Sequence, residues 1–154
     1  MTPNDLDIRP IIQPDLPALI ALYGHLSPED TPIDLASAQQ YLSSLTSIEN
    51  CLIIGGWHAR SLVTTCTVFV LPNLTRSGRP YALIENVVTD EALRGRGFGK
   101  QILSYATDHA FDHGCYKVML MTGSTTPQTL SFYQSAGFTQ NKTGFQKRNL
   151  PIRP

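Results

Sequence analysis

Hydrophobic residues recur every three to four positions in four segments of the chain, which is the spacing of one face of an α-helix. Pro14 and Asp15 suit the start of the first segment, whereas Gly114 and Gly137 stand where a glycine commonly ends a helix. The segments predicted as helices are 14–26, 34–45, 98–113 and 126–138.

Runs of apolar and β-branched residues predict strands around these helices. Gly55 and Gly56, at the end of one run, are expected to form a turn. The predicted strands are 7–12, 51–57, 61–71, 81–89, 116–122 and, as a last strand or hairpin, 138–147. The order β-α-α-β-β-β-α-β-α-β predicts an α/β fold with a mixed sheet and helices on both faces. No repeat or domain boundary is visible, so residues 1–154 are expected to form a single domain.

The balance of charge argues against a protein that coats nucleic acid. The 154 residues carry twelve basic and twelve acidic side chains, so few cations are left to neutralise phosphates. The N-terminus has no apolar signal core and no stretch reaches the length of a membrane span. A soluble, cytoplasmic protein with neither nucleic acid nor membrane as a partner is expected.

Cysteine and histidine spacing gives no metal site. Cys51, Cys66 and Cys115 are odd in number, widely spaced and without a CxxC pair, which is typical of small buried residues in a reducing compartment. His109 and His113 stand four apart on a predicted helix, but no third ligand accompanies them. We therefore expect no metal and no disulfide framework.

The run LRGRGFGKQIL, residues 93–103, places glycines and basic residues where a strand gives way to a helix. A Walker loop would need glycine in place of Arg94, and a GxGxxG fingerprint would need glycine in place of Lys100. What remains is Arg-x-x-Gly-x-Gly, ending at Gly99. The first turn of a helix presents unpaired amides at a positive dipole end, and glycines let an anion approach them. The pattern suits a pyrophosphate, although a helix capped by a flexible turn also explains the glycines.

Two motifs resemble those of the GCN5-related N-acetyltransferases (GNAT family). VVTDEALRGRGFGKQIL, residues 87–103, is similar to the acetyl-CoA signature of that family, and FYQSAGF, residues 132–138, is similar to its second signature. The predicted element order also agrees. The resemblance implies the acyl-CoA N-acyltransferase fold, with a largely antiparallel mixed sheet of six to seven strands and a splayed strand pair that holds the coenzyme.

The resemblance also implies where acetyl-CoA binds as the co-substrate. The pyrophosphate would lie on backbone amides of Arg94, Gly95, Arg96, Gly97, Phe98, Gly99 and Lys100. The pantetheine arm would pair with the backbone of Val87, Val88 and Thr89, and an N–H near Val87 or Val88 would polarise the thioester carbonyl. Thr126 stands where many relatives place an asparagine that helps to hold the coenzyme.

Three residues are candidates for the chemistry. Tyr133 occupies the tyrosine position of the second signature, so the resemblance implies that it protonates the departing thiolate; alternatively it packs its helix against the sheet. Glu85 is a carboxylate in an apolar strand and is the candidate base, acting through water. Asn86 is a candidate substrate contact. In a regular strand Glu85 and Asn86 point to opposite faces, so at most one would face a cleft unless a bulge intervenes; both could instead lie on a solvent-facing edge.

The most similar members of the family are the glucosamine-6-phosphate N-acetyltransferases, but those carry an acid where Asn86 stands. We expect direct acetyl transfer to a primary amine of a small molecule. The acceptor would meet residues 23–33 and 73–79, where His25, Glu29 and Asp30 are candidate contacts. Alternatives are acceptors that are aminosugar phosphates or protein amines, or a non-catalytic sensor that only binds acetyl-CoA. A homodimer is common in the family.

Overall fold

The computed structural model describes residues 5–149, and the chain divides into two units, Met1–Leu120 and Met121–Pro154, which are described separately. The expectation of a single domain stays a prediction. In the first unit the strands are β1 (Asp7–Pro10), β2 (Cys51–His58), β3 (Ser61–Leu71), β4 (Tyr81–Thr89) and β5 (Val118–Leu120), and the helices are α1 (Leu16–Tyr23), α2 (Leu35–Thr46) and α3 (Phe98–Asp112). The second unit contains α4 (Pro127–Ser135).

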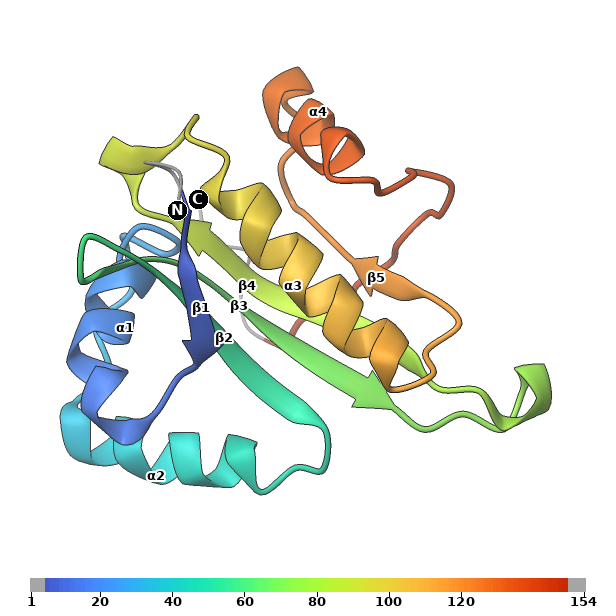
Figure 1. The fold of residues 1–154 in the computed structure, drawn as a ribbon, viewed down its shortest axis with the longest axis horizontal. Coiled ribbons are helices and arrows are strands. Elements are labelled where there is room, and N and C mark those ends of the chain that lie inside the picture. The colour runs from blue at the N-terminus through green and yellow to red at the C-terminus, as the bar shows by residue number, and fades with distance from the viewer. Residues whose placement is uncertain (1–4, 150–154) are drawn as a thin grey trace. The chain divides into compact units, whose positions relative to one another are not determined.

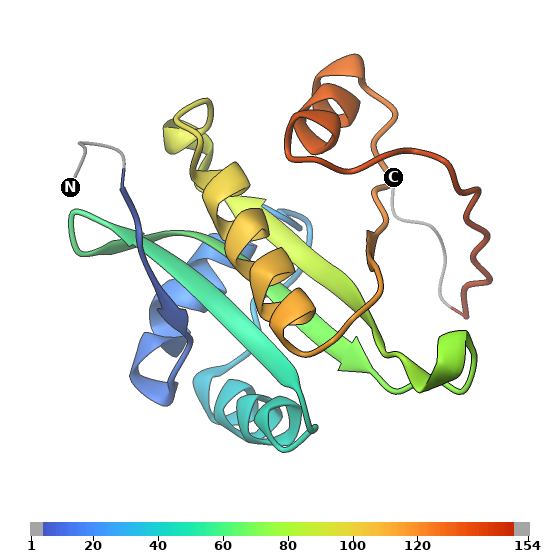
Figure 2. The ribbon, with the colours of Figure 1, turned by 45° about the vertical axis from the view of Figure 1, so that its right-hand side comes forward.

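The five strands form one mixed sheet in the order β1-β2-β3-β4-β5. Neighbouring strands are antiparallel except β4 and β5, which are parallel and are connected through α3. Figures 1 and 2 show α3 lying across one face of this sheet and α1 and α2 packed on the other. The prediction of a mixed sheet with helices on both faces is therefore confirmed.

β3 is the central strand and is buried on both faces. Its buried residues include three threonines, Thr64, Thr65 and Thr67, each at most 3% exposed. A buried hydroxyl is unfavourable unless it is hydrogen-bonded. Thr64 Oγ1 donates to the Val88 carbonyl at 3.0 Å, and Thr65 Oγ1 donates to the Ile54 carbonyl at 2.7 Å. These bonds tie β3 to both of its neighbours in addition to the backbone ladder.

Gly55 and Gly56 do not form the expected turn but lie inside β2. A Cβ at Gly55 would stand 2.5 Å from the Trp57 ring and 2.8 Å from Ile11, so close packing requires glycine there. The turn follows two residues later, at Ala59 and Arg60, whose φ angles of 47° and 70° fit a tight two-residue hairpin.

The sheet has five strands among the described residues, fewer than the six to seven expected. Residues 138–147, expected to be a last strand or hairpin, have no strand pairing in the second unit. All of them except Phe138 are exposed, so no hydrophobic face there drives pairing within the unit.

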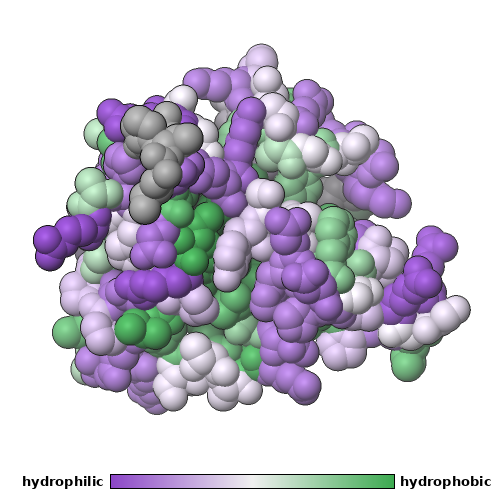
Figure 3. All heavy atoms as spheres, in the orientation of Figure 1, coloured by the Kyte–Doolittle hydropathy of each residue, from purple (hydrophilic) through white to green (hydrophobic). Residues whose placement is uncertain are grey.

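The visible surface carries no unusual concentration of apolar residues. Figure 3 shows hydrophilic residues spread over one face of the molecule, with hydrophobic residues in smaller groups among them. Such exposure is normal for globular proteins. In residues 5–149, no helix combines the length and the apolar character needed to cross a bilayer.

An ion pair joins β1 to the segment before α1. Arg9 forms a bidentate pair with Asp15, with N–O distances of 2.7 and 2.9 Å, and its guanidinium lies 3.6 Å from the centre of the Trp57 ring. Asp15 also accepts a hydrogen bond from the Ile12 amide at 2.9 Å. The hydrogen bond from Arg9 is the main reason that the pKa of Asp15 lies below its ordinary value.

We predict that Asp15→Asn lowers the free energy of unfolding by about 1 kcal/mol at pH 7. Because the folded pKa of Asp15 is lowered, its contribution is present above the unfolded pKa of about 4 and is lost as pH falls through the folded value. The difference from the parent protein should therefore shrink between about pH 5 and pH 2 in urea denaturation series. Asp7→Asn is the control and should change stability little; a pH-independent deficit for Asp15→Asn would contradict the explanation.

Candidate active site

The start of α3 is an open backbone cradle. Gly95 and Gly97 have φ angles of 81° and 85°, a region that side chains rarely adopt, and Gly97 is the N-cap of the helix. A Cβ added at either glycine would meet no heavy atom within 4 Å. The glycines are therefore needed for the backbone conformation, and they leave the space in front of it clear.

Several amides in this cradle point out of the helix without a partner. The first helical bonds are made by the Lys100 and Gln101 amides, which both donate to the Gly97 carbonyl at 3.1 Å. Within residues 5–149, the amides from Gly95 to Gly99 make no hydrogen bond. Phe98 is 1% exposed and anchors the turn in the core. A row of unpaired amides at a positive helix end is a site for an anion.

Basic side chains border the cradle. The Arg94 Nε donates to the Thr89 carbonyl at 3.3 Å, which holds that guanidinium at the end of β4, and its Nη1 lies 3.9 Å from the Glu91 carboxylate. Arg96 and Lys100 are exposed at the same loop and helix start. The amides, the missing Cβ atoms and these charges together fit the pyrophosphate of coenzyme A.

β4 has a backbone edge that its neighbour does not cover. The pairing of β4 with β5 ends at Ile84 and Leu120, whereas β4 continues to Thr89. In the first unit, residues 85–89 therefore have β3 on one side and no strand on the other. An uncovered edge can take an extended ligand as an additional strand, and this edge leads directly into the cradle.

A β-bulge interrupts the β3–β4 ladder at Asn86. Thr67 pairs with Glu85 and Thr65 with Val88, so β4 contains one more residue than β3 over this stretch. Asn86 has a φ of 53°, in the left-handed region that asparagine tolerates better than most residues. The strand is therefore not regular at the point where Glu85 and Asn86 were expected to point apart.

The bulge places Glu85 and Asn86 on the same face of the sheet. Glu85 lies opposite Thr67, and Thr67 is hydrogen-bonded to Tyr23 of α1, so Glu85 lies on the face covered by α1 and α2. Asn86 lines a pocket on that same face. The condition under which both side chains could serve one site is thus met.

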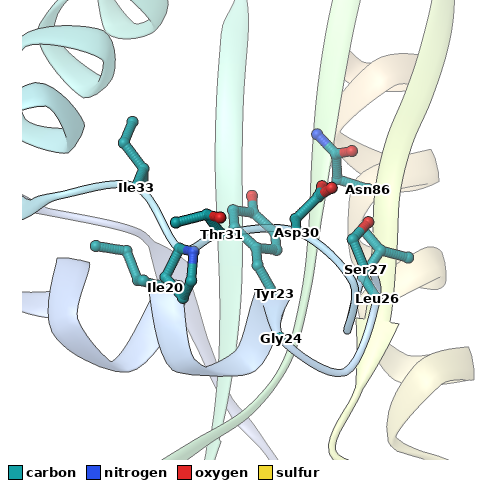
Figure 4. A pocket seen from close by; sticks show the side chains of 10 residues that line it. Ile20, Tyr23, Gly24, Leu26, Ser27, Asp30, Thr31, Ile33 and Asn86 are labelled. Carbon is teal, nitrogen blue, oxygen red and sulfur yellow. The ribbon is translucent and has the colours of Figure 1, made fainter.

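The pocket has a volume of about 300 Å³ and lies between β4 and the segment that joins α1 to α2. Nine of its ten lining residues come from positions 20–33, and the tenth is Asn86. Figure 4 shows the Asp30 carboxylate directed toward the Asn86 side chain. Of the two segments expected to meet an acceptor, 23–33 lines the pocket and 73–79 does not; of the three candidate contacts, Asp30 lines it, whereas His25 and Glu29 do not.

Tyr23 is a pocket residue that the sequence did not single out. It belongs to the apolar face of α1, but its hydroxyl reaches Thr67 on β3. Burial raises the pKa of Tyr23, so the hydroxyl remains protonated at neutral pH. The one indication in the sequence was its position at the end of α1, immediately before the segment expected to meet the acceptor.

The second unit holds the other two candidate residues. Tyr133 is half-buried in α4, with ring centres 4.9 Å from Phe132 and 6.4 Å from Phe138. Thr126 is the N-cap of α4, and its hydroxyl accepts a hydrogen bond from the Thr129 amide at 3.3 Å. Thr126 thus has a local structural role, and the functions assigned to both residues stay predictions.

The cysteines are poor nucleophiles. All three are free and buried, as predicted. Burial raises the pKa of each thiol, and that of Cys66 reaches about 12. Because the thiolate is the reactive form, none of them is suited to carry an acetyl group.

Comparisons with known proteins agree with this geometry. The sequence model of the Acetyltransferase (GNAT) family matches residues 19–138. The chain is 29% identical to Glucosamine 6-phosphate N-acetyltransferase of Trypanosoma brucei brucei (87% of this chain, 89% of the relative), and 29% identical to Glucosamine 6-phosphate N-acetyltransferase 1 of Oryza sativa subsp. japonica (86% and 81%). A solved structure from Agrobacterium tumefaciens str. C58, assigned to the acetyltransferases, is 43% identical with a TM-score of 0.89 (93% and 99%).

These similarities extend over nearly the whole chain and do not favour a non-catalytic sensor, because the relatives are named as enzymes. The resemblance of the two motifs is confirmed. The chain belongs to the GNAT family and is an acetyl-CoA-dependent N-acetyltransferase.

Proposed function

We propose that this enzyme acetylates the primary amine of a small molecule by direct transfer, with the acceptor bound in the pocket beside Asn86. The observation that carries the proposal is the bulge, which turns Glu85 and Asn86 toward the pocket face. The uncovered edge of β4 and the α3 cradle follow within the next few residues of the chain. One short segment thus supplies surfaces for both substrates.

The donor would be held by backbone more than by side chains. The unpaired amides between Gly95 and Gly99 would bind the pyrophosphate, with Arg96 and Lys100 adding positive potential. Val87, Val88 and Thr89 would pair with the pantetheine arm, and an N–H at Val87 or Val88 would polarise the thioester carbonyl. Thr126 is proposed as a further contact to the coenzyme.

The acceptor nitrogen must lose a proton before or while it attacks the thioester carbon. We assign that proton to Glu85, through a water molecule, and the positioning of the amine to Asn86. As the new C–N bond forms, the C–S bond breaks, and the thiolate needs a proton, which we assign to Tyr133. The protonated thiols make an acetyl-cysteine intermediate a poor alternative.

The relatives suggest a first acceptor to test. Two of them are named for glucosamine 6-phosphate, a small primary amine. It belongs at the head of any panel of amines, together with unphosphorylated amino sugars, polyamines and amino acids.

We predict that Gly97→Val weakens coenzyme A binding at least about 100-fold in isothermal titration calorimetry, because a side chain would occupy the cradle and disturb the left-handed N-cap. Gly114→Val is the matched control. Gly114 has a similar φ of 79° and equally open surroundings, but lies beyond the other end of α3. Both variants should lose similar stability, and only Gly97→Val should lose affinity. Equal affinities would remove the cradle from the proposal.

Tyr133→Phe is expected to lower kcat by about 10- to 100-fold while coenzyme A binding is retained, since it deletes only the proposed proton donor. Tyr105→Phe, on the exposed side of α3, should leave kcat unchanged. Activity would be followed as thiol release. A Tyr133→Phe enzyme with full turnover would assign Tyr133 to packing against Phe132 and Phe138.

Replacements at the bulge should separate the two roles proposed there. Glycine readily adopts the positive φ of Asn86, so Asn86→Gly removes the amide with little change to the backbone and should raise KM for the acceptor more than it lowers kcat. Glu85→Gln should instead lower kcat at least about tenfold. If both variants changed only KM, Glu85 would be a binding residue and not the base.

A further inference from the structure

The acceptor pocket has an unusual charge inventory for an enzyme whose relatives are named for a phosphorylated sugar. Among its ten lining residues, all within the described part of the chain, Asp30 is the only one charged at neutral pH, and no lysine, arginine or histidine lines it. Phosphate groups in protein sites are usually met by arginine, lysine or helix amides. A phosphate in this pocket would meet the Asp30 carboxylate and no cation.

The remaining wall of the pocket is mainly apolar. Ile20, Leu26, Pro32 and Ile33 line it, and Leu26 and Ile33 remain 42% and 40% exposed. Apolar surface that lines a pocket and stays in contact with water is stabilised when a ligand covers it. These side chains therefore favour an acceptor whose body is hydrocarbon rather than polyhydroxylated.

We infer that the acceptor is a small cationic amine with an apolar body and without a phosphate, and that Asp30 is the residue that selects it. This inference rests on the proposed function, because it requires the pocket beside Asn86 to hold the acceptor. The ammonium form is attracted by Asp30 from solution, and Asn86, toward which Asp30 is directed, marks the end of the pocket where the nitrogen arrives. Leu26 and Ile33 cover the rest of the molecule.

Matched pairs of amines test the selection. The pairs are glucosamine against glucosamine 6-phosphate, ethanolamine against phosphoethanolamine, and phenethylamine against ethanolamine, each with acetyl-CoA and thiol release as the readout. The unphosphorylated member, and phenethylamine over ethanolamine, should have kcat/KM higher by about tenfold or more. A preference for either phosphorylated amine would overturn the inference while leaving the proposed function intact.

Substitution of Asp30 tests its role directly. Asp30→Asn should raise KM for phenethylamine at least about tenfold with kcat less affected, and Asp30→Lys should move the preference toward glucosamine 6-phosphate. Glu29→Gln is the control, since Glu29 is the neighbouring carboxylate but does not line the pocket. It should leave every ratio unchanged. An unchanged preference in both Asp30 variants, with coenzyme A affinity and melting temperature retained, would overturn the assignment.

The two levels of the proposal fail differently. If no small amine is acetylated but peptide amines are, the proposed small-molecule acceptor is wrong and the inference falls with it. If small amines are acetylated with equal efficiency whatever their charge and body, the proposed function stands and only the inference is overturned.

Discussion

The extra residue that β4 inserts opposite Cys66 sets the geometry of everything around the site. It advances the alternation of side chains along β4, so that Glu85 and Asn86 share a face and Val88 resumes the pairing with Thr65. It requires a residue that tolerates a φ of 53°, which Asn86 provides. It also comes directly after the last pair between β4 and β5, so the strand changes its partners and its faces at one place. Without the extra residue, Asn86 would turn away from the α1 and α2 face.

A bulge weakens a ladder locally, and the neighbouring hydroxyls offset this. Thr64 binds the Val88 carbonyl on the far side of the bulge and lies 2.9 Å from the Thr89 hydroxyl. On the near side, Thr67 is tied to Tyr23 of α1. A short buried run of threonine in β3 thus holds both halves of the interrupted strand. Valine would fill nearly the same space but could not make these bonds.

Most of the fold followed from periodicity, because each helix pairs one apolar face with the sheet and each strand is rich in apolar or β-branched residues. The errors had local causes. Gly55 and Gly56 form strand because Trp57 and Ile11 occupy the space of a side chain, a contact that no local pattern reveals. The cradle at Gly97 was predictable because its chemistry is contained in consecutive residues. The role of Tyr23 was not, since its partner Thr67 is distant in sequence. The bulge was anticipated only as a condition.

The pocket and the cradle have no residue in common: one is built from positions 20–33 with Asn86, the other begins at Arg94. Substitutions in the connection between α1 and α2 therefore leave the start of α3 chemically untouched. After gene duplication, a copy of this protein can acquire a new acceptor by accumulating changes in one surface segment while its hold on the shared acetyl donor persists. Divergence of substrate range within such a lineage needs no remodelling of the sheet.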